Sequence, residues 1–334
     1  MSWRRWRRRI RWPFSYAAVA VTAWVACHLP LSLLRFICGL IGRAIWCLPD
    51  NRKLILTNLK LAFPDWTDAR RCDIGKRSCI HLTYSFLELF WYHKRLPALL
   101  KTARFNDEGE AFHQQMQQQH APAMLLTPHL GCWEIAIHVL GQNGIQASAV
   151  ARKLTNPWIE TFFRQRRELS GCTIIHEKGA IRGLLKSIRQ KEAICLLVDQ
   201  NTRPRHGGYF VPFFGLPASM SRAPAMLHRK SRLPVYGVAC IRQPDFSYIF
   251  HMEPIVGPDE DIDDVAFGER INAFTERYIA SHPEQYLWLY ERWRYFEMDG
   301  DAVIPAQDAY PYYAEAPRYY PPKGESDTDG ENSE

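Results

Sequence analysis

The chain has 334 residues, of which 47% are hydrophobic and 23% are charged. This composition excludes a largely disordered protein and allows either one large α/β domain or two modest domains. The formal net charge of +7 is an average over an uneven distribution, because the arginines gather ahead of the first acidic residue, at Arg4, Arg5, Arg7, Arg8, Arg9 and Arg11. The nine cysteines are scattered and form no C-x-x-C pair. They argue against a disulfide framework and for free thiols in a reducing compartment.

The first 48 residues are predicted to be a basic N-terminus and a membrane anchor. Residues 14–29 are almost wholly apolar, and residues 31–48 continue so apart from Arg35 and Arg43. A spanning helix needs ~20 apolar residues, so a single span and an interfacial, re-entrant anchor are both compatible with the sequence. The arginines favour a cytoplasmic N-terminus. Together with the free thiols, they favour a partly inserted anchor with the main domain on the cytoplasmic face.

Other interpretations of the N-terminus are weaker. A cleaved signal peptide is disfavoured because the apolar region is long and no A-x-A site follows it. A buried helical pair of a soluble protein remains an alternative. The segment Trp3-Arg4-Arg5-Trp6 resembles a single-strand nucleic-acid platform in composition, but its position before an apolar run fits anionic lipid headgroups better. No Walker loop or G-x-G-x-x-G occurs, so no nucleotide or nucleic-acid partner is predicted.

The rest of the chain is predicted to form a helical region and an α/β core. Residues 49–120 have helical spacing, most clearly at residues 51–61 and 82–91. From residue 121 to 300, short apolar strands alternate with helical stretches, which predicts a mainly parallel, open, doubly wound sheet flanked by helices. The strands are expected at residues 124–126, 145–151, 173–176, 193–198 and 235–241, and the helices include residues 158–170, 181–190 and 221–229. The tail 301–334 is rich in proline and acids and is predicted to be disordered.

The segment Pro128-His129-Leu130-Gly131-Cys132-Trp133-Glu134 carries the main chemical signal. On one continuous helix, five residues advance about 500°, so His129 and Glu134 would point apart. We therefore predict a strand-to-helix junction, with His129 in the loop and Glu134 in the first helical turn. The Glu134 carboxylate would then accept a hydrogen bond from one ring nitrogen and leave the other free as a general base.

Three other interpretations of this segment compete with general base catalysis. His129 could simply cap the following helix. Cys132 could be a covalent nucleophile with His129 as its base, although free cysteine more often behaves as a small buried hydrophobe. His129, Glu134 and His138 could bind a metal, but they do not form the H-E-x-x-H arrangement. The sequence therefore predicts no metal site.

Polar residues follow three of the predicted strands, and ligands gather at the carboxyl ends of strands in such sheets. His129 follows the first strand, Arg152 the second, and the pair Asp199-Gln200 follows residues 193–198. We expect these side chains to converge on one site, with Arg152, Asp199 and Gln200 on its substrate-binding side. For Arg152, an ion pair that stabilises the sheet edge is an alternative. For Asp199, orienting a loop is an alternative.

Short sequence blocks occur across roughly residues 30–296: PHLGCWE at 128–134, NLKLAFP at 58–64, Arg152 with Asn156-Pro157, Arg167 followed by Gly171, Asp199-Gln200, VPFFG at 211–215, and PEQYLWLYERW at 283–293. Taken together, these blocks resemble the bacterial lipid A late acyltransferases, within the larger group that shares an H-x4-E/D motif. The acidic tail lies outside the family pattern, and Glu291 stands where basic or histidine residues are common.

The resemblance implies an enzyme on the cytoplasmic face of the inner membrane. Such an enzyme transfers a fatty acyl chain from acyl carrier protein to a hydroxyl of a lipid A precursor, without cofactor or metal. By the same resemblance, His129 is the base and Glu134 its partner, and Arg167 is important for activity, although an ion pair at the sheet edge is an alternative for it. An acyl thioester donor needs a base and a donor-rich site for the developing oxyanion, and a phosphorylated acceptor suits arginines. Related enzymes that acylate other membrane glycolipids or aminolipids, and a non-catalytic membrane-anchored lipid-binding scaffold, are the alternatives.

Overall fold

The computed structural model describes residues 3–119, 122–300 and 302–317. Its centre is a sheet in which seven strands follow the order β1-β9-β8-β2-β5-β3-β4. The strands are β1 (Ala103–Phe105), β9 (Tyr248–Val256), β8 (Val235–Arg242), β2 (Met124–Thr127), β5 (Ala193–Leu197), β3 (Ala147–Ala151) and β4 (Thr173–His176). Neighbouring strands pair in parallel except β8 and β9, which are antiparallel. The predicted mainly parallel α/β sheet is confirmed.

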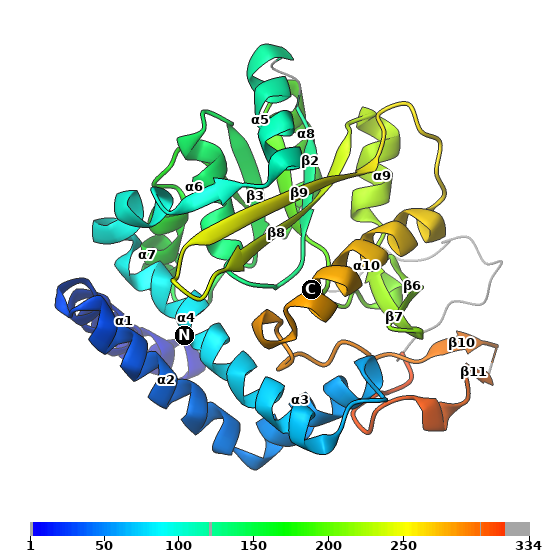
Figure 1. Cartoon of the computed structure of the whole chain (residues 1–334), viewed down its shortest axis with the longest axis horizontal. Coiled ribbons are helices and arrows are strands. Elements are labelled where there is room, and N and C mark those ends of the chain that lie inside the picture. The colour runs from blue at the N-terminus through cyan, green and yellow to red at the C-terminus, as the bar shows by residue number, and fades with distance from the viewer. Residues whose placement is uncertain (1–2, 120–121, 301, 318–334) are drawn as a thin grey trace.

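Helices cover both faces of this sheet (Figure 1). They are α5 (Asp107–Gln119), α6 (Trp133–Gln142), α7 (Pro157–Arg167), α8 (Ala180–Arg189), α9 (Ala223–Ser231) and α10 (Asp264–Ser281). Because side chains alternate along a strand, Leu125 of β2 is buried in the cluster that includes α6. Met124 and Leu126 are buried in the cluster with residues of α8, α9 and α10. Both faces of the central strands are therefore apolar, as a doubly covered sheet requires.

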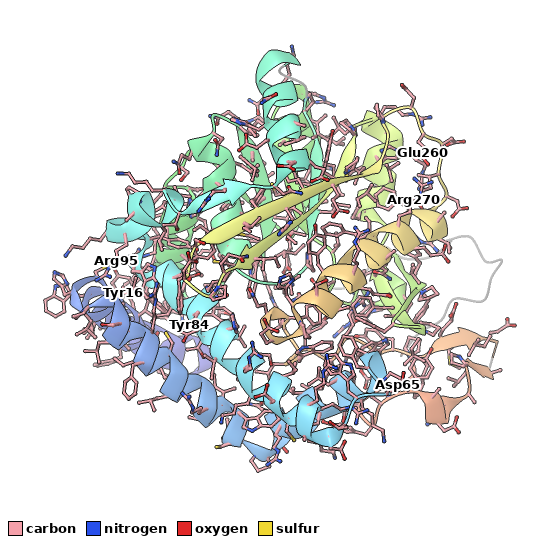
Figure 2. The ribbon with its side chains drawn as sticks, viewed as in Figure 1. Tyr16, Asp65, Tyr84, Arg95, Glu260 and Arg270 are labelled. Atoms are coloured by element: carbon pink, nitrogen blue, oxygen red, sulfur yellow. The ribbon has the colours of Figure 1, made fainter. Side chains whose placement is uncertain are left out.

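Four N-terminal helices lie along one side of the core: α1 (Trp3–His28), α2 (Leu31–Cys47), α3 (Pro49–Ala62) and α4 (Asp68–Leu100). Helix α4 packs against α1, α2 and α6, and thereby joins these helices to the sheet. Figure 2 shows Tyr16 of α1 and Arg95 of α4 near this junction. Arg95 Nη2 donates a hydrogen bond to the carbonyl oxygen of Leu29, and the Tyr16 ring packs edge-on against Trp158 of α7 with 5.9 Å between ring centroids.

The predicted membrane anchor corresponds to α1 and α2. Within the described residues, no single helix is both long and apolar enough to cross a bilayer, although α2 and α3, bent by 86°, pass by length and composition when taken together. Several large apolar side chains on α1 and α2 are exposed, among them Phe14 at 74%, Trp24 at 65% and Phe36 at 62%. The anchor remains a prediction.

The sequence missed several elements of the chain. Strand β1 lies within the region predicted to be helical, and β9 and α10 were not predicted. The hairpin of β6 (Gly208–Phe213) and β7 (Leu216–Ser221) was also missed. Short 3-10 turns lie at Pro204–His206, Pro283–Gln285 and Gln307–Ala309.

The predicted disorder of the tail was wrong for residues 302–317. Strand β10 (Glu297–Asp299) pairs with β11 (Ala302–Ile304), and the Tyr310 ring is buried against Phe296. The Tyr313 hydroxyl donates a hydrogen bond to Asn58 Oδ1 on α3. Burial of aromatic side chains therefore stabilises an ordered structure in residues 302–317, although their composition predicted disorder. Residues 318–334 lie outside the described part of the chain.

Candidate active site

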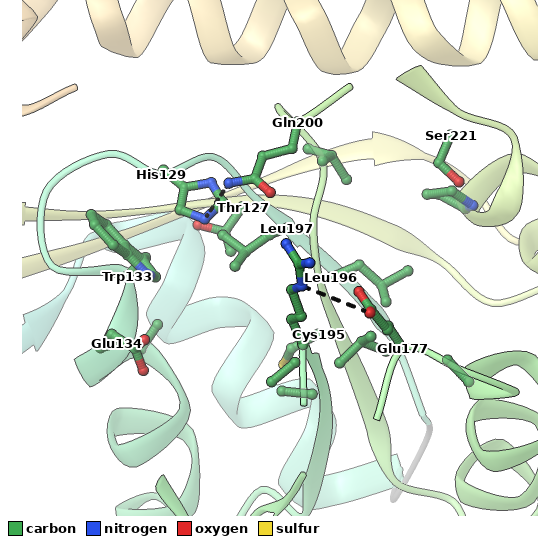
Figure 3. Close-up of a pocket in the computed structure, with 18 of the residues that line it drawn as sticks. Thr127, His129, Trp133, Glu134, Glu177, Cys195, Leu196, Leu197, Gln200 and Ser221 are labelled. Carbon is green, nitrogen blue, oxygen red and sulfur yellow. Dashed lines mark hydrogen bonds and ion pairs between the residues drawn. The ribbon is translucent and has the colours of Figure 1, made fainter. Parts of the chain in front are cut away.

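A cavity of about 1170 Å³ opens at the carboxyl ends of β2, β3 and β5. Part of its wall is apolar and includes Leu125, Ile137, Leu140 and Ala149. Its polar part is lined by the predicted residues His129, Glu134, Arg152, Arg167 and Gln200. Figure 3 shows His129, Glu134 and Gln200 in this part. The structure therefore brings five of the six predicted site residues to one cavity.

The loop that carries His129 is held tightly against its surroundings. Gly131 has φ of +63°, and a Cβ at this position would lie 2.0 Å from the carbonyl oxygen of Cys240, so a side chain is excluded there. The backbone N–H of Gly131 donates to the carbonyl oxygen of Gln285, and that of Leu287 donates to the carbonyl oxygen of His129. The strand-to-helix junction predicted from the sequence is present, since β2 ends at Thr127 and α6 begins at Trp133.

His129 is oriented by Asp199, which contradicts the predicted pairing with Glu134. The Nδ1 atom of His129 lies 2.7 Å from Asp199 Oδ1, and the backbone N–H of His129 donates to Asp199 Oδ2 at 2.9 Å. Asp199 is 5% exposed and is not part of the cavity wall, so it lies behind the imidazole and not on the substrate side as expected. Burial raises the pKa of Asp199, but the His129 imidazole, its hydrogen bonds and Arg292 outweigh burial and lower it. Asp199 is therefore an ionised partner for the ring.

The contacts of the ring assign its tautomer. An ionised carboxylate is an acceptor, so Nδ1 carries the hydrogen that is donated to Asp199. The other ring nitrogen, Nε2, lies 3.4 Å from the amide nitrogen of Gln200 in the cavity wall, and it accepts there. The Trp133 ring packs edge-on against the imidazole at 5.1 Å between centroids and limits its rotation. His129 therefore presents a basic nitrogen to the cavity.

Glu134 instead holds Arg167. Arg167 Nε donates to Glu134 Oε2 at 2.9 Å, and Arg167 Nη2 donates to Glu134 Oε1 at 2.6 Å. This is a bidentate, charge-assisted pair, which fixes the plane of the guanidinium. Burial alone lowers the pKa of Arg167, but the charge and hydrogen bonds of Glu134 outweigh it and raise the pKa. A cation with a fixed orientation therefore lines the cavity beside the His129 loop. The ion pair of Arg167 joins α7 to the first turn of α6 and not to a strand at the sheet edge.

Arg152 is held less firmly than Arg167. Its side chain is 85% exposed, and its Nε lies 4.0 Å from Glu177 Oε1 (Figure 3). An exposed pair at this distance stabilises the fold little. Arg152 therefore lies at the exposed rim of the cavity with only a weak contact to the protein.

A buried ionic cluster below the loop was missed by the sequence analysis. Glu88 of α4 accepts hydrogen bonds from Arg242 Nη2 at 2.9 Å, from the Tyr248 hydroxyl at 2.6 Å and from the Cys132 thiol. Ser85, one turn away, donates to the carbonyl oxygen of Gly131. The one signal in the sequence was an acidic residue inside the aromatic helical segment 82–91, where exposure is the usual outcome. The cluster ties α4 and β8 to the loop between His129 and Glu134.

The cluster also settles the role of Cys132. Its side chain is 0% exposed, and burial, followed by Glu88, raises the pKa of its thiol well above the usual value. A protonated, buried thiol that is not in the cavity wall is a packing residue, as the sequence favoured, and not a nucleophile.

The three residues of the metal alternative, His129, Glu134 and His138, each contact another side chain. Among the described residues, no group of three His, Cys, Asp or Glu side chains could hold a metal ion. His138 Nδ1 lies 2.9 Å from Ser170 Oγ, and burial lowers the pKa of His138 to about 4. Its two proposed companions, His129 and Glu134, are engaged by Asp199 and Arg167.

The remaining sequence blocks pack around the His129 loop. Asn58 Nδ2 donates to the carbonyl oxygens of Trp288 at 2.8 Å and Tyr290 at 2.9 Å, which joins the block at 58–64 to the block at 283–293. Asn156 caps α7 by accepting from the Trp158 N–H at 3.0 Å, and it positions the helix that carries Arg167. Of these blocks, the one at 283–293 lines the cavity through Leu287 and Tyr290, while Asn58 and Asn156 lie outside its wall.

The chain is similar in sequence to known proteins of one family. A model of the family described as "Bacterial lipid A biosynthesis acyltransferase" matches residues 4–295. The lipid A biosynthesis lauroyltransferase of Escherichia coli (strain K12) is 25% identical over 285 residues, which are 81% of this chain and 88% of that protein. The palmitoleoyltransferase of the same strain is 25% identical over 282 residues, with the same coverage. The myristoyltransferase of that strain is 22% identical over 246 residues, which are 72% of this chain and 74% of that protein.

Proposed function

Because this chain belongs to the bacterial lipid A biosynthesis acyltransferase family, we propose that it transfers a fatty acyl chain from acyl carrier protein to a hydroxyl group of a lipid A precursor. The observation that carries the proposal is the His129 ring, whose Nδ1 is fixed by Asp199 while Nε2 lies in the wall of a large, partly apolar cavity. A base in that position serves direct attack by an acceptor hydroxyl, so no covalent intermediate on the protein is needed.

The proposed step is a direct acyl transfer. His129 Nε2 takes the proton of the acceptor hydroxyl as its oxygen attacks the thioester carbonyl carbon, and a tetrahedral oxyanion forms. Asp199 stabilises the imidazolium that results. The intermediate then collapses as the carbon–sulfur bond breaks, and the imidazolium returns its proton to the leaving thiolate. The products are an ester and a free thiol.

Arg167 is proposed to stabilise the oxyanion. Its Nε and Nη2 are committed to Glu134 at 2.9 and 2.6 Å, and it lines the same cavity as His129. A fixed cation close to the reacting carbonyl group stabilises the charge that develops in the transition state. Glu134 therefore acts as a positioning residue for Arg167 in this mechanism, and not as the partner of the base.

The apolar part of the cavity is proposed to hold the acyl chain. Leu125, Ile137, Leu140 and Phe163 line that part, and chain length would follow from its depth. Neighbouring chain lengths would be separated by only about 1–3 kcal/mol per methylene group. At the rim, Arg152 and Gln200 would contact the acceptor, since a guanidinium suits a phosphorylated glycolipid.

The acceptor is a membrane lipid, so we place the enzyme on the cytoplasmic face of the inner membrane. The proposal is supported by exposed apolar side chains on α1 and α2, which include Phe14, Trp24 and Phe36, by the arginines of the N-terminus, and by free cysteines throughout the described chain. Aromatic residues beside arginines suit a membrane interface with anionic headgroups.

The test is His129→Ala in purified, full-length protein, assayed with acyl carrier protein thioester and a lipid A precursor. We expect the turnover rate to fall by about 10²- to 10⁴-fold while the thermal melting curve stays unchanged. His206→Ala, an exposed histidine outside the cavity, is the control. In parallel, mass spectrometry of envelope lipids with and without the gene should show the loss of one acyl chain from lipid A. Unchanged lipids would favour a non-catalytic scaffold, and a change in another lipid would favour a different acceptor.

A further inference from the structure

Helix α8 presents an outward face made of cations. Arg182, Lys186 and Arg189 are exposed and follow one another at spacings of four and three residues, which places them on the same side of the helix. Lys178 precedes α8 and Lys191 follows it, and both are exposed. In the described part of the chain, no carboxylate oxygen lies within 4 Å of any of these five cations, since none belongs to an ion pair there.

The stability of α8 does not explain this row. Cations near a helix C-terminus are favourable, and Lys186 and Arg189 lie in the last turn. Arg182 lies in the first turn and Lys178 just before the helix, where the helix dipole disfavours positive charge. The first turn contains no acidic residue that would offset them. The opposite face of α8 already anchors it, because Leu184 is buried against the sheet.

The cationic row begins at the mouth of the active-site cavity. Ala180, Ile181 and Leu184 of α8, and Glu177 just before the helix, line the cavity together with Arg152. Figure 3 shows Glu177 on the same side of the cavity as Ser221, across from His129 and Trp133. A macromolecule docked on α8 would therefore have the opening of the cavity beside it.

The row faces away from the apolar N-terminal helices. Helix α8 covers the sheet face that packs with α9 and α10, whereas α4, on which α1 and α2 pack, covers the other face. Figure 1 shows α8 on the far side of the molecule from α1 and α2. The exposed face of α8 includes no large exposed apolar side chain, which is unlike the outward faces of α1 and α2. Helices that insert into a membrane interface carry such side chains on one face.

We propose that the cationic row of α8, defined as Lys178, Arg182, Lys186, Arg189 and Lys191, is the docking surface for an acidic carrier protein whose tethered acyl thioester enters the cavity beside it. This inference rests on the proposed function, and it names the surface that receives the donor. Charge complementarity brings such a partner to the enzyme quickly and orients it. The tether then reaches the base while the lipid acceptor approaches from the α1 and α2 side.

The experiment compares two sets of three charge reversals in full-length protein in detergent micelles. The test variant is Arg182→Glu, Lys186→Glu, Arg189→Glu. The control variant is Lys60→Glu, Lys101→Glu, Arg104→Glu, which changes exposed cations of α3, the end of α4 and β1 by the same total charge. Each protein is assayed with acyl carrier protein thioester and with the acyl-pantetheine thioester of the same chain, which lacks the protein.

We expect the test variant to raise KM for the carrier-bound donor by about tenfold or more, because three exposed charges each contribute a modest favourable interaction. Its kcat and its rate with acyl-pantetheine should stay within about twofold of the unsubstituted protein. The control variant should keep the KM of the unsubstituted protein. The neutral variant Arg182→Gln, Lys186→Gln, Arg189→Gln should raise KM less and flatten its dependence on salt. The neutral variant also replaces the charge-reversed variant as the test if the latter folds poorly, as judged by its melting curve.

An unchanged KM in the test variant, or an equal rise in both variants, would overturn the docking surface. So would a test variant that keeps its KM in detergent but loses binding to phosphatidylcholine vesicles containing phosphatidylglycerol, since the row would then bind lipid. Absence of transfer from either donor by the unsubstituted protein would refute the proposed function instead. In that case, titration of the unsubstituted and test proteins with holo acyl carrier protein still decides the surface, because binding needs no turnover.

Discussion

The substitution Asp199→Asn separates the charge of Asp199 from its shape. Asn keeps the size of the side chain and an oxygen that accepts from the backbone N–H of His129, the bond seen at 2.9 Å. It removes the negative charge that lies 2.7 Å from Nδ1. Asn also carries an amide N–H, which can donate to Nδ1 and so favours the tautomer with its hydrogen on Nε2. We therefore expect the fold to persist and the base to lose most of its activity.

The expected size of the effect follows from the distance between the two side chains. Two unit charges separated by the observed 2.7 Å attract by about 6 kcal/mol at an effective dielectric constant of about 20. About half of the imidazolium charge sits on Nδ1, so about 3 kcal/mol of the stabilisation of the protonated ring is lost. This corresponds to a rate about 10²-fold lower, and the tautomer change lowers the rate further, by up to about 10⁴-fold in total.

The assay is single-turnover acyl transfer at saturating donor, followed by mass spectrometry of the acylated acceptor. Glu253→Gln is the control, because it also replaces a paired carboxylate by an amide but lies outside the cavity. Glu253 accepts a hydrogen bond from the Tyr278 hydroxyl and forms an ion pair with Arg277. That control should keep its rate. If Asp199→Asn retained more than about a third of the rate, stabilisation of the imidazolium by Asp199 would be refuted.

Two further substitutions test the surroundings of the base. Glu134→Gln should lower kcat by about 10²- to 10³-fold with little change in KM, because Arg167 would lose the charge that fixes its orientation. Steady-state kinetics with both substrates measures kcat and KM separately. A rise in KM alone would make Arg167 a binding residue. Glu88→Gln should lower the free energy of unfolding by about 3–5 kcal/mol in urea denaturation, because Arg242 would be left as a buried charge without its partner. Adding Arg242→Met should restore part of that loss, and an unstable double variant would contradict the account.

The local features of the fold could be predicted from the sequence. The strands at 124–126 and 173–176 were placed within one residue of β2 and β4, because a short apolar run bounded by polar residues is a local signal. Strand β9 was missed because it pairs antiparallel to β8 within an otherwise parallel sheet. Strand β1 was missed because it is a short strand inside residues 49–120, which have helical spacing. The folded tail was missed because burial of Tyr310 depends on a surface that only the assembled core provides.

The partners of the charged side chains could not be predicted in the same way. Convergence of His129, Arg152 and Gln200 on one edge followed from the topology of a parallel sheet, and the cavity confirms it. The pairing of Glu134 with His129 was inferred from closeness in sequence, and it was wrong. Glu134 lies in the first turn of α6, and the direction in which its carboxylate points is decided by α7, which brings Arg167 to it. The Glu88–Arg242 pair joins residues 154 positions apart, and no local pattern reports such a contact.

Two carboxylates therefore orient two different side chains of the site: Asp199 orients His129, and Glu134 orients Arg167. The spacing of the motif at 128–134 explains why Glu134 does not serve His129. His129 precedes the turn at Gly131, and Glu134 follows it, so one rigid loop carries the base and the residue that orients the cation. Its stiffness comes from Glu88 through Cys132 and from Ser85 through Gly131. A shift of this loop would move the base relative to Asp199 and the cation relative to the substrate at once. Since misplacement by about 1 Å can reduce a rate by about 10²-fold, the buried ionic cluster under the loop sets the geometry on which the proposed transfer depends.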